Sequence, residues 1–509
     1  MTAAQAEIDR THGGLFGRSP LFLWCTVGFL FLLGLGVRLL DVDEPPLDFH
    51  PDRQLQSALI ARGLYYRWLP QADPETRSQA ETLGAIWVSS EPPIQEGLVA
   101  ATYLIAGGEL LWLARLWSIL FWMIGGWILF RLAWRLTNPD GAVIALAFYF
   151  IVPMGVYVSR SFQPDSMMVM LLVAAAAAAE RWATERSWKW TLLAGLMAGL
   201  VVLSKGRPAP IVAGMLVGAV LAAAGLRRAV RDPQVWVLAA ITVLLPAFYY
   251  VFPRLSSVTG YLTEYSGRVA GLLFQPSFYI RWALLLDDIV YLGLAALGLV
   301  GVALLAPRGR GLLLGLWVGY LVYGLSLSYP IMTHNYYSAP LIPIVALSLA
   351  PIGKVVLGEV AARGRVWAAY CLMILLGLIA YRSWLTRSVI LSTDYRPEPY
   401  GWIAMGRALP GDGRIIGLTH DYGARVAYYG WKHVLAWPVE GDLKLFALQG
   451  RDDNLEARQV ILEKTQNYRY FLVTLFGELE KQPALQQFLA ELPVAVEGDG
   501  FILYDLEGS

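Results

Sequence analysis

Residues 21–40 read LFLWCTVGFLFLLGLGVRLL, and residues 41–54 continue as DVDEPPLDFHPDRQ. The first stretch is apolar over about 20 positions, the length with which a helix crosses the hydrocarbon core of a bilayer. The second stretch carries four aspartates, a glutamate and a histidine directly after that run. We therefore expect a retained membrane helix, without a signal-peptide cleavage site, followed by an acidic extramembrane loop.

The composition of the whole chain is that of a membrane protein. It has 509 residues, of which 57% are hydrophobic and 16% are charged, and its formal net charge is +1. Apolar runs of spanning length recur along it, which predicts an all-α polytopic membrane domain. The near-zero charge argues against a nucleic-acid partner. Both cysteines, Cys25 and Cys371, fall inside apolar runs, where we expect them to be packing residues.

The apolar runs predict about eleven spans. Their approximate ranges are 20–40, 112–134, 141–159, 165–181, 189–204, 208–226, 235–252, 283–306, 311–328, 336–352 and 366–384. Segment 93–110 is apolar but is interrupted by Glu96 and Glu109. We expect it to lie along the membrane surface or to re-enter the membrane.

Lysines and arginines gather in alternate short loops, and the positive-inside rule places these loops and the N-terminus in the cytoplasm. The odd number of spans then places the C-terminal region outside. We expect a multi-pass protein of a bacterial plasma (inner) membrane, with its active site and C-terminal domain extracytoplasmic. Arg160, Lys205 and Arg207 depart from the pattern because they follow spans in predicted outer loops. They are either snorkelling anchors or parts of an anion site.

The character of the chain changes after about residue 390. Short β-like runs alternate there with amphipathic runs, at residues 414–418, 455–464, 470–474, 483–492 and 501–504. This alternation predicts a small soluble α/β domain. We therefore expect a transmembrane catalytic domain at residues 1–389, which includes a first outer loop at 41–111, and an extracytoplasmic domain at residues 390–509.

Carboxylates in the first outer loop and at the entrance of spans are candidates for chemistry. Asp48 and Asp52 lie four residues apart, and either could be a general base that takes a proton from an acceptor hydroxyl. Asp52 could instead cap the helix that follows it. Glu91 and Glu96 flank a Pro-Pro pair, or are simple surface acids. Asp165 stands at the start of a predicted span. It could be a helix cap, a second acid of a reaction centre or a metal ligand.

Cations and aromatic residues form the other candidates. Lys205 and Arg207 stand beside a glycine at a helix end. The point charge of a lysine ammonium and the planar, bidentate guanidinium of an arginine both suit a phosphate. His334, Tyr336 and Tyr337 open a later span, and an interfacial aromatic belt explains the tyrosines but not the histidine. All these groups lie at predicted outer ends of spans, so they can converge on one outward-facing cavity.

The order of these motifs resembles the GT-C superfamily of polyprenyl-phosphate-sugar-dependent glycosyltransferases. The nearest branch contains the protein O-mannosyltransferases and the lipid A aminoarabinose transferase, that is, family 39 and its bacterial relatives. The matching elements are the acidic first loop, Glu91-Pro92-Pro93-Ile94, Asp165, Leu203-Ser204-Lys205-Gly206 and His334-Asn335-Tyr336-Tyr337. They cover about residues 20–350. The usual Asp-Glu pair is replaced by Asp48-Phe49-His50-Pro51-Asp52-Arg53, and Glu91 stands where the aminoarabinose branch has a lysine.

This resemblance implies an inverting transfer of a sugar from a polyprenyl-phosphate donor to a hydroxyl of a lipid, glycan or protein acceptor. Asp48 or Asp52 would be the base, with Asp48 preferred and Asp165 assisting. The implied donor-phosphate ligands are Lys205, Arg207 and Arg160, and the implied substrate-binding residues are Glu91, Glu96, His334, Tyr336 and Tyr337. The sequence leaves the need for a divalent cation open. A transporter or lipid flippase is one alternative, although the chain lacks the repeated halves typical of transporters. A structural or assembly subunit whose tail binds partners is another.

Overall fold

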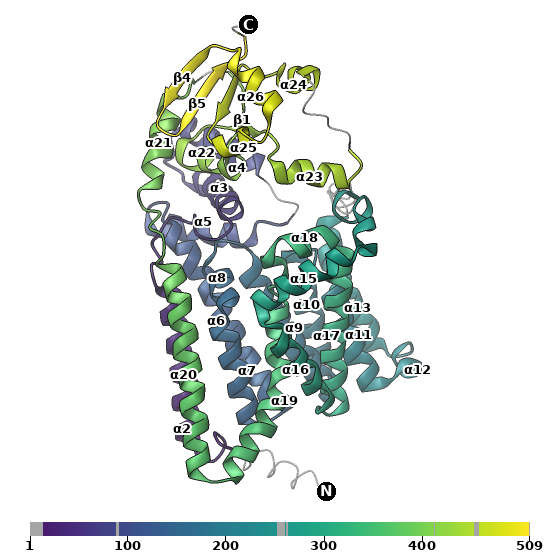
Figure 1. The fold of residues 1–509 in the computed structure, drawn as a ribbon. Helices are drawn as coiled ribbons and strands as arrows, with labels where there is room; N and C mark the ends of the chain where they lie inside the picture. Colours follow the sequence, from purple (N-terminus) through teal and green to yellow (C-terminus); the bar gives the residue numbers. More distant parts are fainter. Residues whose placement is uncertain are drawn as a thin grey trace. The chain divides into compact units, whose positions relative to one another are not determined.

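The computed structural model describes residues 14–87, 91–251, 260, 263–411, 413–451 and 458–507. The chain packs into two compact units. One comprises Met1–Val42, Ser90–Pro92 and Arg115–Ser392, and the other comprises Asp43–Ser89, Pro93–Ala114 and Thr393–Ser509. Each unit is described by itself, with the element labels of Figure 1.

The first unit is helical. Its elements are α2 (Pro20–Leu39), α6 (Leu111–Leu136), α7 (Pro139–Ile151), α8 (Pro153–Arg160), α9 (Asp165–Glu185), α10 (Trp188–Ser204), α11 (Ala209–Ala224), α12 (Leu226–Ala229), α13 (Pro233–Tyr250), η1 (Thr263–Gly267), η2 (Ala270–Phe274), α15 (Pro276–Val290), α16 (Leu292–Ala303), α17 (Pro307–Ser326), α18 (Ser328–Thr333), η3 (Asn335–Ser338), α19 (Leu341–Ala362) and α20 (Arg365–Ile390). Figure 1 shows α2 and α20 side by side, and the two helices are in contact.

Among the described residues, six helices are long and apolar enough to cross a membrane, or up to eight if each bent pair is one span. Four shorter apolar helices of 10–17 residues accompany them. Two predicted spans are interrupted. The span expected at 141–159 breaks between α7 and α8, and the one expected at 283–306 breaks at Tyr291, between α15 and α16. Each break has a local cause in the backbone. Pro153 interrupts the first span, and the left-handed backbone of Tyr291 (φ 56°) interrupts the second.

Close packing of α11 against α17 depends on glycine. A Cβ added to Gly218 would lie 2.1 Å from the carbonyl oxygen of Gly311, and one added to Gly214 would lie 2.3 Å from that of Gly315. Because these glycines are four residues apart on each helix, they form facing small-residue stripes that let the backbones touch.

The break before α8 is stabilised from neighbouring helices. Pro153 has no N–H, so carbonyl oxygens of the preceding turn lose their helical donor. The indole of Trp122 donates to the carbonyl of Tyr149 at 3.4 Å, and the guanidinium of Arg38 donates to the carbonyl of Phe150 at 3.1 Å. In a membrane these carbonyls need such replacement donors. The 59° bend that results sets the direction of α8, the helix that ends at Arg160.

The second unit combines helices of the predicted first outer loop with the C-terminal part of the chain. Its elements are α3 (Pro51–Trp68), α4 (Pro74–Ile86), α5 (Ile94–Ala106), α21 (Glu398–Ala408), β1 (Ile415–Leu418), η4 (His420–Gly423), α22 (Ala424–Gly430), β2 (Val434–Ala436), α23 (Glu440–Leu448), α24 (Arg458–Thr465), β3 (Tyr470–Val473), α25 (Phe476–Leu479), α26 (Pro483–Ala490), β4 (Val494–Gly498) and β5 (Phe501–Asp505). The predicted α/β character of the tail is confirmed.

The sheet has the strand order β2-β1-β3-β5-β4. Strands β2, β1 and β3 are parallel, while β5 joins β3 and β4 in antiparallel fashion. Alternate residues of a strand point to opposite sides of the sheet, and in β3 both sets are buried, so both faces of the sheet are covered. Phe471 and Val473 enter a core with Trp437, whereas Tyr470 and Leu472 enter a second core. The runs expected at 414–418, 470–474 and 501–504 are β1, β3 and β5.

The outer-loop helices are joined to the C-terminal residues through Arg62 of α3. Its guanidinium lies between two rings, 3.9 Å from the ring centre of Tyr428 and 4.3 Å from that of Trp431. It also pairs with Glu109 at 2.8 Å and donates to the carbonyl of Tyr428 at 2.6 Å. Burial alone would lower the pKa of Arg62, but the neighbouring Tyr428 and Glu109 outweigh it and raise that pKa above its ordinary value. This buried cation therefore stays charged and links two distant parts of the sequence.

Candidate active site

The centre of the candidate site is an ion pair between Asp165 and Lys205. The Nζ of Lys205 lies 2.7 Å from the Oδ1 of Asp165, and both side chains are almost fully buried, at 2% and 1% exposure. Asp165 is the first residue of α9, where a carboxylate is favourable at the positive end of the helix. Lys205 follows the last residue of α10 in an extended conformation. Two helix ends 40 residues apart thus meet through opposite charges.

Tyrosines and a second ion pair surround this centre. The ammonium of Lys205 lies 5.2 Å from the ring centre of Tyr336 and 5.7 Å from that of Tyr337. The guanidinium of Arg207 lies 5.3 Å from the ring centre of Tyr337 and 3.7 Å from the carboxylate of Glu91. The geometry therefore brings together six residues, including Asp165, that the sequence placed in four separate motifs.

The late aromatic motif is held in place by its own hydrogen bonds. The ring of His334 lies 5.8 Å from that of Tyr336, and its Nδ1 is 2.8 Å from the hydroxyl of Thr333. Tyr323 of α17 donates from its hydroxyl to the carbonyl of Tyr337 at 3.1 Å. The ring of His334 therefore lies beside Tyr336, and Tyr336 in turn lies beside the ammonium of Lys205.

A second group of cations lies at the end of the first apolar helix. The guanidinium groups of Arg160 and Arg115 both donate to the backbone carbonyl of Asp41, at 3.2 and 3.3 Å. Asp41 has a left-handed backbone (φ 53°), which turns the chain directly after α2. Arg38 lies within electrostatic range of Arg160, and its Nε donates to the hydroxyl of Ser159 at 2.7 Å. Three buried guanidinium groups therefore gather around one turn.

Arg160 is the member of this group predicted from the sequence, whereas Arg38 and Arg115 are not among the predicted site residues. A signal was present, because each is a lone arginine inside or at the edge of an apolar run, and an ionisable residue there is a functional candidate by default. From the sequence, Lys205 and Arg207 are predicted to be cations available to a phosphate. In the structure each of them has an acidic partner, Asp165 or Glu91.

The remaining predicted site residues belong to the other unit. Asp48 precedes α3 and accepts a hydrogen bond from the amide of Gln54 at 3.3 Å. Asp52 lies in the first turn of α3, directly after Pro51 and the left-handed His50. Glu96 in the first turn of α5 is buried and accepts from the hydroxyl of Ser57 at 2.9 Å. The meeting of these carboxylates with the Lys205 cluster stays a prediction.

A metal site would need several ligands close together. Within the part of the chain that the structure describes, no group of three or more His, Cys, Asp and Glu side chains is placed to hold a metal ion. The Oδ2 of Asp165 is buried and has no hydrogen-bond partner among the described residues. One carboxylate oxygen is a small donor set for a hard cation, which prefers six or more oxygen ligands.

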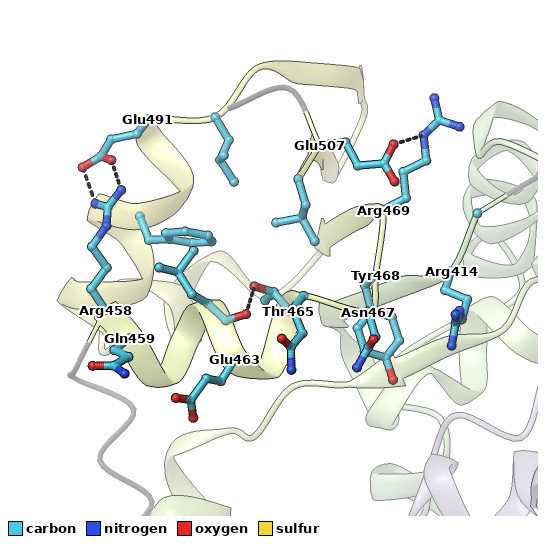
Figure 2. A pocket seen from close by; sticks show the side chains of 16 residues that line it. Arg414, Arg458, Gln459, Glu463, Thr465, Asn467, Tyr468, Arg469, Glu491 and Glu507 are labelled. Atoms are coloured by element: carbon cyan, nitrogen blue, oxygen red, sulfur yellow. Dashed lines mark hydrogen bonds and ion pairs between the residues drawn. The ribbon is translucent and has the colours of Figure 1, made fainter.

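The C-terminal domain contains a separate cavity of about 840 Å³ (Figure 2). It lies beside the start of β1 and of β3 and against α24 and α26. Figure 2 shows Arg458 paired with Glu491, at 2.6 Å for the shorter contact, and Arg469 facing Glu507 at 3.6 Å. Two of its arginines are thus balanced by acids. The cavity suits an uncharged polar molecule better than a phosphate.

A family model and solved structures match this chain. Residues 90–251 match the family described as dolichyl-phosphate-mannose-protein mannosyltransferase. This segment contains six of the predicted site residues, namely Glu91, Glu96, Arg160, Asp165, Lys205 and Arg207. No curated protein matches the chain.

Two solved structures share the fold along most of the chain. One is the crystal structure of ArnT from Cupriavidus metallidurans bound to undecaprenyl phosphate, with a TM-score of 0.58, 15% identity, and coverage of 94% of this chain and 97% of that chain. The other is the archaeal oligosaccharyltransferase AglB from Archaeoglobus fulgidus in complex with an inhibitory peptide and a dolichol-phosphate, with a TM-score of 0.57, 16% identity, and coverage of 91% and 70%. The predicted GT-C fold is confirmed. The matches indicate an integral, multi-pass membrane glycosyltransferase.

Proposed function

We propose that this protein moves a sugar from a polyprenyl-phosphate donor to a hydroxyl acceptor, on the extracytoplasmic face of a bacterial inner membrane and with inversion at the anomeric carbon. The observation that carries the proposal is the buried Asp165–Lys205 pair, next to Arg207 and two tyrosines in a helical unit. The undecaprenyl phosphate bound to ArnT in its solved structure supports a polyprenyl-phosphate carrier for the sugar here.

The leaving group is the first task of the site. When the bond between sugar and phosphate breaks, the departing phosphate gains negative charge, and donors placed beforehand stabilise it. Lys205 keeps two N–H donors besides the one directed at Asp165. Arg207 can add a planar fork, and Arg160 with its neighbour Arg115 supplies a further pair of guanidinium groups. These residues bind and stabilise the phosphate in our proposal.

The acceptor hydroxyl needs a base on the opposite side of the sugar. Asp48 or Asp52 takes its proton in our proposal, and attack from the face opposite the phosphate gives inversion. Asp48 is favoured because it precedes α3 and is oriented by Gln54, whereas Asp52 belongs to the first turn of α3. Glu91 and Glu96, with His334, Tyr336 and Tyr337, contact the sugar and the acceptor.

The acceptor itself is a lipid, a glycan or a protein. The polar cavity of the C-terminal domain supports a contribution of that domain to acceptor binding, because its two ion pairs leave little net charge. A glycan has the hydroxyl-rich, uncharged surface that such a lining suits.

A transporter or lipid flippase is the competing function, and the broken spans favour it to some degree, since transporters often use interrupted helices. One assay separates the two. The purified full chain, in detergent with membrane extract as acceptor, is given a polyprenyl-phosphate donor that carries a radiolabelled sugar. Release of polyprenyl phosphate with label in the acceptor supports the transferase, and the Lys205→Ala variant should abolish it. Intact donor after long incubation of active, folded protein would contradict the proposal.

A further inference from the structure

A second cavity lies at the ends of the helices opposite to those that carry the predicted outer-face motifs. It has a volume of about 870 Å³ and is formed by the end of α6, the end of α9, the start of α17 and part of α19. All these elements belong to the helical unit. A volume of this size is in the range of cavities that bind small ligands or head groups.

The charges in this cavity do not cancel. Its acids already have cations: Glu180 pairs with Arg135 at 2.7 Å, and Glu185 pairs with Arg181 at 2.5 Å. The other two cations of the lining, Arg308 and Lys354, are exposed and have no ion pair or hydrogen bond from their side chains to any described residue. The lining therefore carries three cations, Arg135, Arg308 and Lys354, against two acids, a net excess of one positive charge, and its acids are already paired.

The backbone adds to this field. α17 begins after Ala306, whose side chain offers no cap, and its first internal hydrogen bond runs from the N–H of Arg310 to the carbonyl of Ala306. The N–H groups of Arg308 and Gly309 therefore precede the helical ladder, at the positive end of a 20-residue helix. An anion in the cavity would meet these donors together with two cationic side chains.

The remaining lining is apolar. Trp134, Leu136 and Leu304 contribute side chains to the same cavity. A free inorganic anion would gain nothing from this surface, whereas a molecule with a charged head and apolar tails would use both parts. The location at the ends of membrane-length helices is also the level at which lipid head groups lie.

We propose that this cavity binds the phosphate head group of an anionic phospholipid, which is neither the sugar donor nor the acceptor. The phosphodiester lies between Arg308, Lys354 and the N-terminus of α17, and the glycerol and the start of the acyl chains pack against the apolar wall. This lipid belongs to the leaflet at the end of the helices where the basic loops gather, the predicted cytoplasmic side.

The test is a lipid titration of the purified full chain by native mass spectrometry, with phosphatidylglycerol and with phosphatidylcholine. One variant combines Arg308→Ala with Lys354→Ala. Its matched control combines Arg363→Ala with Arg365→Ala, which removes two exposed basic residues that do not line the cavity. A third variant, Thr184→Trp, fills the cavity without changing its charge. Thermal unfolding in detergent checks that all variants are folded.

We expect phosphatidylglycerol to bind more tightly than phosphatidylcholine. Removal of each cation should weaken phosphatidylglycerol binding about fivefold, so the double variant should lose roughly 25-fold. The control should keep at least half of the wild-type affinity, and Thr184→Trp should lose affinity although its charge is unchanged. Equal binding of the two lipids would overturn the inference, as would equal losses in the control, or full affinity in the filled variant. Glycerol phosphate without acyl chains should not compete at the same concentration, and competition by it would also overturn the lipid assignment.

Discussion

The buried pair of Asp165 and Lys205 makes a prediction that separates stability from catalysis. Lys205→Met removes the ammonium but keeps the length of the side chain, and Asp165→Asn removes the partner charge. Each single change leaves one charge buried at about 1–2% exposure without its counterion. The double variant, with both changes, leaves a neutral pair in the same volume. The three variants together form a thermodynamic cycle.

The magnitude follows from the geometry. At 2.7 Å the attraction between two unit charges is about 6 kcal/mol for an effective dielectric constant of 20. Most of this attraction offsets the loss of hydration on burial, so the pair adds little net stability. Removal of one partner, however, leaves an uncompensated charge and costs about 3–5 kcal/mol. We therefore expect both single variants to lose about that much unfolding free energy, and the double variant to return to within about 1–2 kcal/mol of the wild type.

The assay measures reversible unfolding in mixed detergent micelles, alongside transfer from a polyprenyl-phosphate donor. Arg268→Met is a suitable control, because it removes a cation from an exposed ion pair with Glu264 in the same unit, and such pairs contribute under about 1 kcal/mol. The double variant should be stable and inactive, since the ammonium that stabilises the leaving phosphate is absent. Single variants as stable as the Arg268 control would refute the buried pair, and an active double variant would remove Lys205 from the chemistry.

Three further changes test the fold. Gly218→Leu should destabilise the helical unit by about 1–3 kcal/mol or more, because its Cβ would lie 2.1 Å from the carbonyl oxygen of Gly311, and thermal unfolding would report it. Arg62→Ala should cost roughly 3–5 kcal/mol as a broken buried pair, whereas Arg67→Ala in an exposed pair should cost under about 1 kcal/mol. Burial lowers the pKa of the His420 imidazole below its ordinary value of 6.5, so folding favours the neutral form. The free energy of unfolding should therefore decrease as pH falls below about 6.5, and His420→Gln should reduce that pH dependence.

Much of the fold could be predicted from local pattern. The β-like runs of the tail match β1, β3 and β5. In β3, for example, the apolar residues are buried in cores on the two faces of the sheet. Apolar run length likewise predicted the long helices. It could not predict where a run breaks, because the break at Pro153 persists only with donors from Arg38 and Trp122, which lie on other helices.

The residues of the candidate site could be predicted from the sequence, but which of them form ion pairs with each other could not. Sequence position placed Asp165, Lys205, Tyr336 and Tyr337 at ends of predicted spans on one side, and the structure brings them together. Which acid neutralises which cation depends on how α9 and α10 pack, and no local rule contains that information. The same holds for Arg115, whose contact with the carbonyl of Asp41 depends on a turn 74 residues earlier.

These pairings change the role that the geometry supports for Asp165. A carboxylate that holds the ammonium of Lys205 at 2.7 Å and lies at the start of a helix already makes two interactions within the protein. An ammonium fixed in this way needs no reorganisation when charge develops on a departing phosphate, and such preorganisation is a large source of catalysis. We therefore propose that Asp165 acts on the reaction by positioning Lys205. In this proposal the base belongs to the acidic loop that follows the first apolar helix. Asp165→Glu, which keeps the charge but moves it by one methylene, should accordingly lower the rate of transfer while leaving its pH dependence in place, whereas loss of the true base should change both.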